Sequence, residues 1–181
     1  QRIGNPEWLA QGLIRLAGLN RQANDANLAL SLLFNALDIY RTTTRPQALS
    51  RLNHEIGKTY LKLGNLVAAR TYLIAALNGY KLHRDAQGEL ATQVTLSELY
   101  LRKNEPEMAI SLLESMPVPQ KGSATDLERH YLLAEAYEHK GQYLQALSHF
   151  KLFAATPKVS FPMPFSAQEK GFAWWFLTAA T

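Results

Sequence analysis

The sequence predicts an all-α protein built from stacked helix pairs, and three observations carry this prediction. First, a small residue, a tyrosine three positions later and an alanine nine positions after that occur together three times. The tyrosines are Tyr60, Tyr100 and Tyr137, so the pattern repeats after 40 and then 37 residues. Second, apolar residues recur at spacings of three and four, as in helices. Third, a helix break falls at the same place in each repeat. Because a helix pair cannot bury its apolar stripe alone, the repeats are expected to stack.

The first predicted unit, about residues 5–44, is the weakest copy of the pattern. Ala17 and Ala29 occupy the places of the small residue and the alanine, but Asn20 replaces the tyrosine. The start of the unit is better defined. Asn5-Pro6-Glu7 combines a capping residue, a proline for the first helical position and an acid in the first turn. We therefore count this segment as a degenerate helix pair.

The other three units are expected at about residues 45–84, 85–122 and 123–158, and they differ in the sequence of their break. The breaks are Gly64-Asn65, Asn104-Glu105-Pro106 and Gly141-Gln142. Glycine tolerates the left-handed backbone that ends a helix, asparagine can cap the next helix, and proline suits a first helical turn. The regular array is thus predicted over residues 1–160, as about four helix pairs.

Residues 161–181 are predicted to form a proline-rich linker followed by a C-terminal helix. Ser166-x-x-Glu169 has the spacing of a capping box, so the helix would run from Ala167 to about Ala180. Four aromatic residues make its middle apolar nearly all round: Phe172, Trp174, Trp175 and Phe176. Two interpretations stay open. The helix caps the fourth pair, or it forms an association surface for a homodimer, because a terminal cap usually has a polar outer face.

Composition excludes several classes of protein. The chain has 19 Lys and Arg against 15 Asp and Glu, and the basic residues are scattered, so nucleic acid is not an expected partner. It has no cysteine, which excludes disulfides, thiolate nucleophiles and cysteine-based zinc sites. No apolar stretch reaches the roughly 18 residues that a membrane span needs. The chain begins with Gln1 and shows no signal peptide, so we expect a piece of a longer protein or a processed form, of undetermined compartment.

Searches for catalytic and metal motifs find only incomplete ones. Gly57-Lys58-Thr59 resembles the end of a phosphate-binding loop, but the glycine required five residues earlier is Leu52. His54-Glu55 begins like a zinc-protease helix, but the second histidine would stand at position 58, which is lysine. His130 and His139 are nine residues apart and complete no metal cluster. We therefore predict no catalytic residue, no metal site and no cofactor, and we expect the chain not to be an enzyme.

The repeated pattern resembles the tetratricopeptide-repeat (TPR) superfamily over about residues 10–158. Units of 37 to 40 residues are similar to the longer-repeat arrays found in bacterial regulatory and signalling proteins. The resemblance implies a right-handed superhelix whose first helices line a concave groove that binds peptides or protein segments. It does not extend to the carboxylate clamp of chaperone-binding TPR proteins. The positions where that clamp places asparagine hold Gly18, Lys58, Glu98 and Glu135.

Helical spacing predicts which residues of each first helix face away from the repeat core. In phase, these are Gln11, Ile14, Gly18 and Gln22; Arg51, His54, Lys58 and Lys62; Ala91, Val94, Glu98 and Arg102; and Glu128, Tyr131, Glu135 and His139. The order runs from uncharged through basic and mixed to acidic and aromatic. Eight of these residues are the candidate binding residues: Arg51, His54, Lys58, Lys62, Glu98, Arg102, Tyr131 and Glu135. Our hypothesis is that Arg51, Lys58 and Lys62 attract an anionic group while Tyr131 packs on an apolar one. The alternative is that these are ordinary solvated helix faces.

The sequence therefore favours a non-enzymatic scaffold that binds a protein or peptide partner in its groove. A second interpretation is a ligand- or peptide-responsive regulatory region of a larger bacterial signalling or transcription-regulating protein. The sequence does not identify the partner or the biological process.

Overall fold

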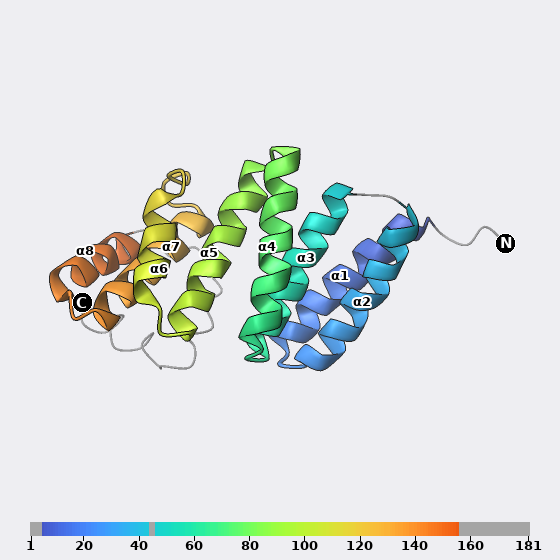
Figure 1. Cartoon of the computed structure of the whole chain (residues 1–181), viewed down its shortest axis with the longest axis horizontal. Coiled ribbons are helices and arrows are strands. Elements are labelled where there is room, and N and C mark those ends of the chain that lie inside the picture. Colours follow the sequence, from blue (N-terminus) through green and yellow to red (C-terminus); the bar gives the residue numbers. More distant parts are fainter. Residues whose placement is uncertain (1–4, 44–45, 156–181) are drawn as a thin grey trace.

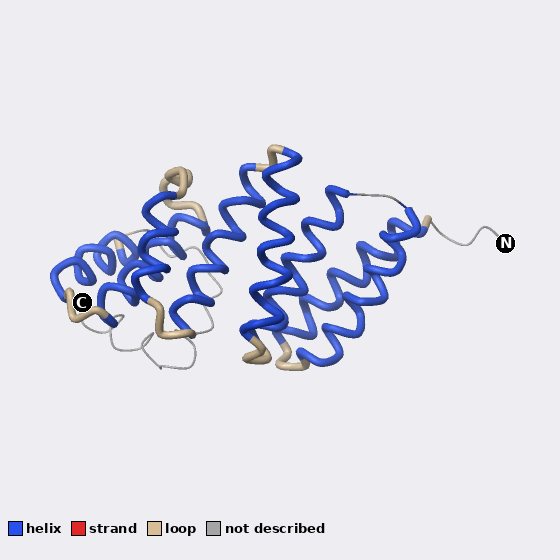
Figure 2. The backbone as a smooth tube through the Cα atoms, in the orientation of Figure 1, coloured by secondary structure: helices blue, strands red, loops and turns tan. Residues whose placement is uncertain are grey.

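The computed structural model describes residues 5–43 and 46–155, which consist of helices and short connections (Figures 1 and 2). Within these residues there are eight helices and no strand. They are α1 Pro6–Gln22, α2 Ala26–Thr43, α3 Pro46–Lys62, α4 Leu66–His83, α5 Ala86–Arg102, α6 Pro106–Ser115, α7 Ala124–His139 and α8 Tyr143–Ala154. The prediction of an all-α helical-repeat solenoid is confirmed. The predicted C-terminal helix, with Phe172, Trp174, Trp175 and Phe176, lies outside the described residues.

The helix pairs follow one another in space in the order in which they occur in the chain (Figure 1). Each helix contacts the next one, and the odd-numbered helices also contact each other, α1 with α3, α3 with α5 and α5 with α7. The first helices of the four pairs therefore form an inner row. We call the side of this row that carries Arg51, Lys58, Glu98 and Glu128 the inner face.

Small residues of the repeated pattern lie where two helices approach each other closely. Ala17, Ser97 and Ala134 are fully buried. Gly57 on α3 has no room for a side chain, because an added Cβ would lie 2.7 Å from Cγ of Leu73 and 3.3 Å from the carbonyl oxygen of Ala69 on α4. The pattern thus marks the contact between the two helices of a pair.

The breaks and starts of helices follow the local chemistry of the sequence. Gly64, in the break between α3 and α4, has a φ of +76°, which glycine adopts without strain. The Asn65 side chain then accepts a hydrogen bond of 3.1 Å from the backbone N–H of Ala68 and caps α4. At the start of α1, the Asn5 side chain accepts a bond of 3.0 Å from the N–H of Glu7, as the sequence predicts.

Candidate binding surface on the inner helices

The structure corrects the predicted orientation of one position on each inner helix. Ile14, His54, Val94 and Tyr131 occupy equivalent places, and all four are buried, with exposed fractions of 1% to 8%. Neighbouring inner helices contact each other, and this position lies in the packed interior instead of facing solvent. Helical spacing predicts the direction in which a side chain points, but it does not show that a neighbouring helix covers that side.

Tyr131 illustrates the correction most clearly. Its ring lies edge-on to Phe150 and tilted against Phe153 of α8, with ring centres 6.3 Å and 5.6 Å away. The aromatic group that we expected to offer to a ligand therefore belongs to the core of the fourth pair.

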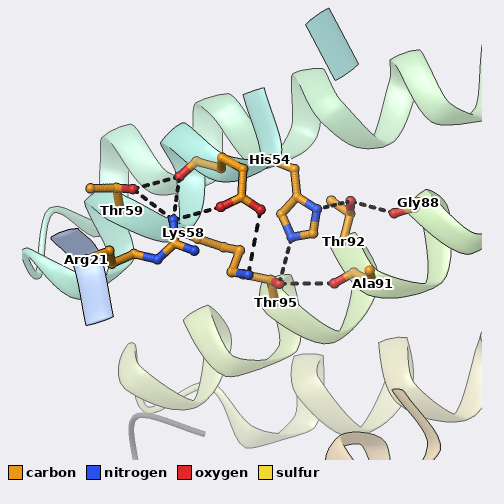
Figure 3. Close-up of polar contacts among 9 residues, drawn as sticks. Arg21, His54, Lys58, Thr59, Gly88, Ala91, Thr92 and Thr95 are labelled. Carbon is orange, nitrogen blue, oxygen red and sulfur yellow. Dashed lines mark hydrogen bonds and ion pairs between the residues drawn. The ribbon is translucent and has the colours of Figure 1, made fainter. Parts of the chain in front are cut away.

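His54 is held by polar groups of the following helix pair. Its Nε2 lies 3.2 Å from the hydroxyl of Thr95 and its Nδ1 lies 3.5 Å from that of Thr92, both on α5 (Figure 3). These threonines donate their own protons to backbone carbonyls of α5, so each can only accept from the imidazole. Burial, together with the nearby Lys58, lowers the pKa of His54 to about 4. A neutral imidazole has one N–H, and the shorter contact, to Thr95, is where that proton is best placed.

Next to His54, Glu55 organises a group of charges between α1 and α3. Its carboxylate lies 2.8 Å from the guanidinium of Arg21 and 3.8 Å from Nζ of Lys58 (Figure 3). Arg21 also donates a hydrogen bond of 3.2 Å to the Thr59 hydroxyl. Burial by itself would raise the pKa of Glu55, but Lys58 and Arg21 outweigh it and lower the pKa to about 2. The positive charge of Lys58, a predicted site residue, is thus partly balanced by Glu55, which was not predicted.

Glu98 and Arg102, both predicted site residues, form an ion pair on α5. Their charged groups are 2.9 Å apart, and Arg102 also donates a hydrogen bond of 2.9 Å to the carbonyl of Leu61 on α3. Burial raises the pKa of Glu98 and the nearby Glu135 adds to the rise, while Arg102 and Lys58 oppose it. Both Glu98 and Glu135 are buried. The predicted residues of α3, α5 and α7 therefore interact electrostatically across the inner face.

Glu128 on α7 belongs to the same set, although it was predicted only to face away from the core and was not among the eight candidate binding residues. Burial and the charge of Glu98 raise its pKa to about 7, and Lys58 acts in the opposite direction. Its place in phase with Arg51 was the sequence signal that could have identified it. Lys58, Glu98 and Glu128 come from three successive inner helices, so the inner face carries one continuous line of charge.

A cleft of about 260 Å³ lies at the N-terminal part of the inner row. It is lined by residues of α1, of α3 and of the ends of α2 and α4, among them Gln11, Arg15, Tyr40, Arg51 and Tyr80, and by Asp85, which caps α5. Arg51 is exposed, as predicted for a binding residue, and lies close enough to Tyr80 to act on its pKa. Burial and the nearby Asp85 raise that pKa to about 12, with Arg51 opposing. Lys62 is half-buried farther along α3.

The histidines near the fourth pair form a different arrangement from the one considered on sequence grounds. His130 on α7 pairs with His149 on α8, not with His139, and their Nδ1 atoms are 3.0 Å apart. Burial lowers the pKa of both rings, and Asp126, 3.7 Å from His130, opposes the shift there. Among the described residues no three histidine or carboxylate side chains are grouped so as to hold a metal ion.

One helix pair carries a family signature. Residues 50–78, most of α3 and most of α4, match a family model described as tetratricopeptide repeat. This helix pair is therefore similar to a tetratricopeptide repeat. No curated protein matches its sequence. TPR repeats generally mediate protein–protein interactions, and this fold is typically a non-enzymatic scaffold.

Solved structures share the TPR fold at low sequence identity. One is a putative kinesin light chain with nearly identical TPR-like repeats from Podosopora anserina, with a TM-score of 0.65 and 19% identity over 90% of this chain and 76% of that chain. Another is BtubC (BKLC) from P. vanneervenii, with a TM-score of 0.66 and 17% identity over 91% of this chain and 73% of that chain. These similarities extend the TPR fold well beyond the matched repeat. No helix in the described part of the chain is long and apolar enough to cross a membrane.

Proposed function

We propose that the inner face binds an extended segment of a partner protein and orients it by charge. The observation that carries the proposal is the line of charged residues on successive inner helices. Arg51 lies at the cleft, Lys58 follows on the same helix, and Glu98 and Glu128 lie on the next two inner helices. A segment with an acidic residue at one end and a basic residue at the other would match this order.

The acidic residue of this segment is proposed to bind at the cleft. Within the residues that the structure describes, Arg51 forms no ion pair, and it is exposed at the cleft that Tyr80 also lines. An incoming carboxylate can therefore pair with Arg51 without displacing an internal partner. Lys58 is a weaker candidate than the sequence suggested, because Glu55 already lies 3.8 Å from its Nζ.

The basic residue of the partner segment is proposed to bind near Glu128. Its pKa of about 7 shows that an ionised carboxylate here is poorly compensated by its surroundings. A lysine or arginine of the partner would provide the missing positive charge and would lower that pKa on binding. Glu98 cannot serve equally well, because Arg102 already forms an ion pair with it.

A selection of random peptides on the immobilised chain tests this proposal. We expect the selected peptides to carry an acidic and a basic residue in a constant order, and to bind about tenfold or more weakly to the Arg51→Glu variant. Arg70→Glu is the matched control, because Arg70 is an exposed arginine on the outer helix α4. Binding measured by fluorescence anisotropy should weaken with salt for the wild type and for the control. Equal loss in both variants, or selected peptides without a charge order, would contradict the proposal.

We propose as the second candidate that the chain is the ligand- or peptide-responsive region of a larger bacterial signalling or transcription-regulating protein. Repeats of 37 to 40 residues support it, because they are similar to those of bacterial regulatory arrays. The coding sequence around this segment tests the idea. An adjoining output domain is the expected finding, and a gene that encodes only the repeats would refute it.

A further inference from the structure

The side of α1 that faces away from α3 carries a line of exposed apolar residues. Trp8 is 75% exposed, and Leu9, Leu16 and Leu19 are 56%, 47% and 62% exposed. We call the side of α1 that carries Leu9, Gly12, Leu16 and Leu19 the N-terminal face. It belongs to the first helix pair, at one end of the row (Figure 1). A contiguous line of exposed apolar side chains of this kind marks a contact surface.

The internal repeat of the chain shows what this face is built to contact. One unit later, Gly12, Leu16 and Leu19 correspond to Leu52, Ile56 and Thr59 on α3, and all three of these are fully buried. Leu52 and Ile56 pack into the core of the first pair, and Thr59 accepts a hydrogen bond from Arg21 of α1. The N-terminal face is therefore the same surface that elsewhere in the molecule docks against neighbouring helices.

The spacing of the four residues fits another helix lying along α1. Positions 9, 12, 16 and 19 are separated by three, four and three residues, which is the alternation of a two-helix seam. No contact within the chain requires a glycine at position 12, because a Cβ added to Gly12 would meet nothing within 4 Å. A glycine in an exposed helix is unfavourable by itself, but it lets a partner helix approach closely.

The seam is also complementary to itself. If two α1 helices pack antiparallel about a two-fold axis near position 14, Leu9 of one copy lies opposite Leu19 of the other, and Gly12 lies opposite Leu16. The large side chain of Leu16 of each copy then fills the space above Gly12 of the other copy. A contact of this kind closes after two copies, as in the most common class of homo-oligomer.

We propose that this chain forms a homodimer through antiparallel packing of the N-terminal faces of two α1 helices. The contact is separate from the inner face, so it leaves Arg51 and Glu128 available. It also differs from an association through residues 161–181. A dimer would present two inner faces in a fixed relation, so a partner with two binding segments would be bound with increased avidity.

Sedimentation velocity of the full chain at concentrations up to about 0.1 mM tests the proposal. The wild type is expected to dimerise, and Gly12→Leu and Leu16→Glu are each expected to weaken dimerisation about tenfold or more, since one fills the space for Leu16 and the other places a charge in the seam. Gly12→Leu is the sharper variant, because it has free space in the monomer and improves helix propensity, so its folding should not suffer. Val67→Glu, which changes an 81% exposed apolar residue on α4, is the control and should leave the dimer intact.

Disulfide trapping tests the register of the two helices. The chain has no cysteine, so a mixture of Gly12→Cys and Leu16→Cys proteins can form disulfides only through positions 12 and 16. The mixed disulfide should form faster than that between two Gly12→Cys chains, because the antiparallel register places positions 12 and 16 opposite each other. A monomeric wild type would overturn the proposal. A dimer that survives both seam variants, or cross-linking without a preference, would also overturn it and would move any association to another surface.

Discussion

At the scale of single residues, His54 shows how burial turns a polar side chain into a pH-sensitive part of the core. Its ring contacts Thr92 and Thr95 across the junction between the second and third units, and Tyr80 lies edge-on to it. Because its pKa in the folded protein is about 4, the imidazole remains neutral well below the pH at which it would be protonated in the unfolded chain.

The stability contributed by neutral His54 should therefore be lost as the pH falls from about 6.5 towards about 4. In this range the unfolded chain binds a proton at position 54 and the folded chain does not, so protonation favours unfolding by up to about 3 kcal/mol. Glu128 has the opposite effect between about 4.5 and 7, because its raised pKa lets the folded chain bind the extra proton. The effect of Glu55, whose pKa is about 2, lies below pH 4.5.

Urea denaturation of the wild type and of His54→Gln between pH 4.5 and 7.5 isolates the His54 effect. Glu128 and Glu55 are present in both proteins, so their effects largely cancel in the difference. We expect the wild type to lose stability relative to His54→Gln as the pH decreases. Parallel curves would show that His54 titrates normally in the folded protein.

At the scale of helices, Gly57 marks the closest approach of α3 and α4. We expect Gly57→Leu to destabilise the protein by about 1–3 kcal/mol, because the new side chain would overlap Leu73 on α4. Gly18→Ala is a matched control on α1, where an added Cβ meets nothing within 4 Å, and it should stabilise the helix by about 0.5–1 kcal/mol. Thermal unfolding followed by circular dichroism measures both. A Gly57→Leu protein that melts no earlier than the wild type would contradict this account of the pattern.

The helices could be predicted from the sequence because their determinants are local. Asn5 and Asn65 cap helices, and Gly64 adopts a left-handed backbone, through contacts that reach only a few residues along the chain. The candidate site was harder, because its partners are distant in sequence. The ion pair of Arg21 with Glu55 joins positions 34 residues apart in the chain, and no spacing rule within one helix reveals it.

The same limit explains the error at Tyr131. Its position on α7 was inferred correctly as the equivalent of His54, but this position is buried in all four units. At this position the chain has isoleucine, histidine, valine and tyrosine in turn, and a single helix contains no information about which neighbour covers it. Glu98 and Glu135 are buried as well, but Lys58 and Glu135 both act on the pKa of Glu98 across the inner face.

At the scale of the whole molecule, the contacts run mainly between neighbouring helices, so stability should vary along the row. Leu33 and Leu99 are both fully buried, Leu33 on α2 at the end of the row and Leu99 on α5 in its middle. Replacing either by alanine should cost about 2–5 kcal/mol, but the consequences should differ. A defect in an end unit lets that unit open by itself, whereas a defect in the middle removes a neighbour from both sides.

Hydrogen exchange followed by mass spectrometry, at a concentration where the chain is monomeric, can resolve this difference. Leu33→Ala should accelerate exchange in α1 and α2 by about tenfold or more and leave α5 protected, because the first pair contacts the rest of the row mainly through α3. Leu99→Ala should accelerate exchange in α3, α4, α5 and α6 together, since Leu99 belongs to the core cluster that joins α4 to α5. Equal acceleration along the whole chain in both variants would instead show that the array unfolds as one cooperative unit, and the repeats would then be coupled more strongly than nearest-neighbour stacking implies.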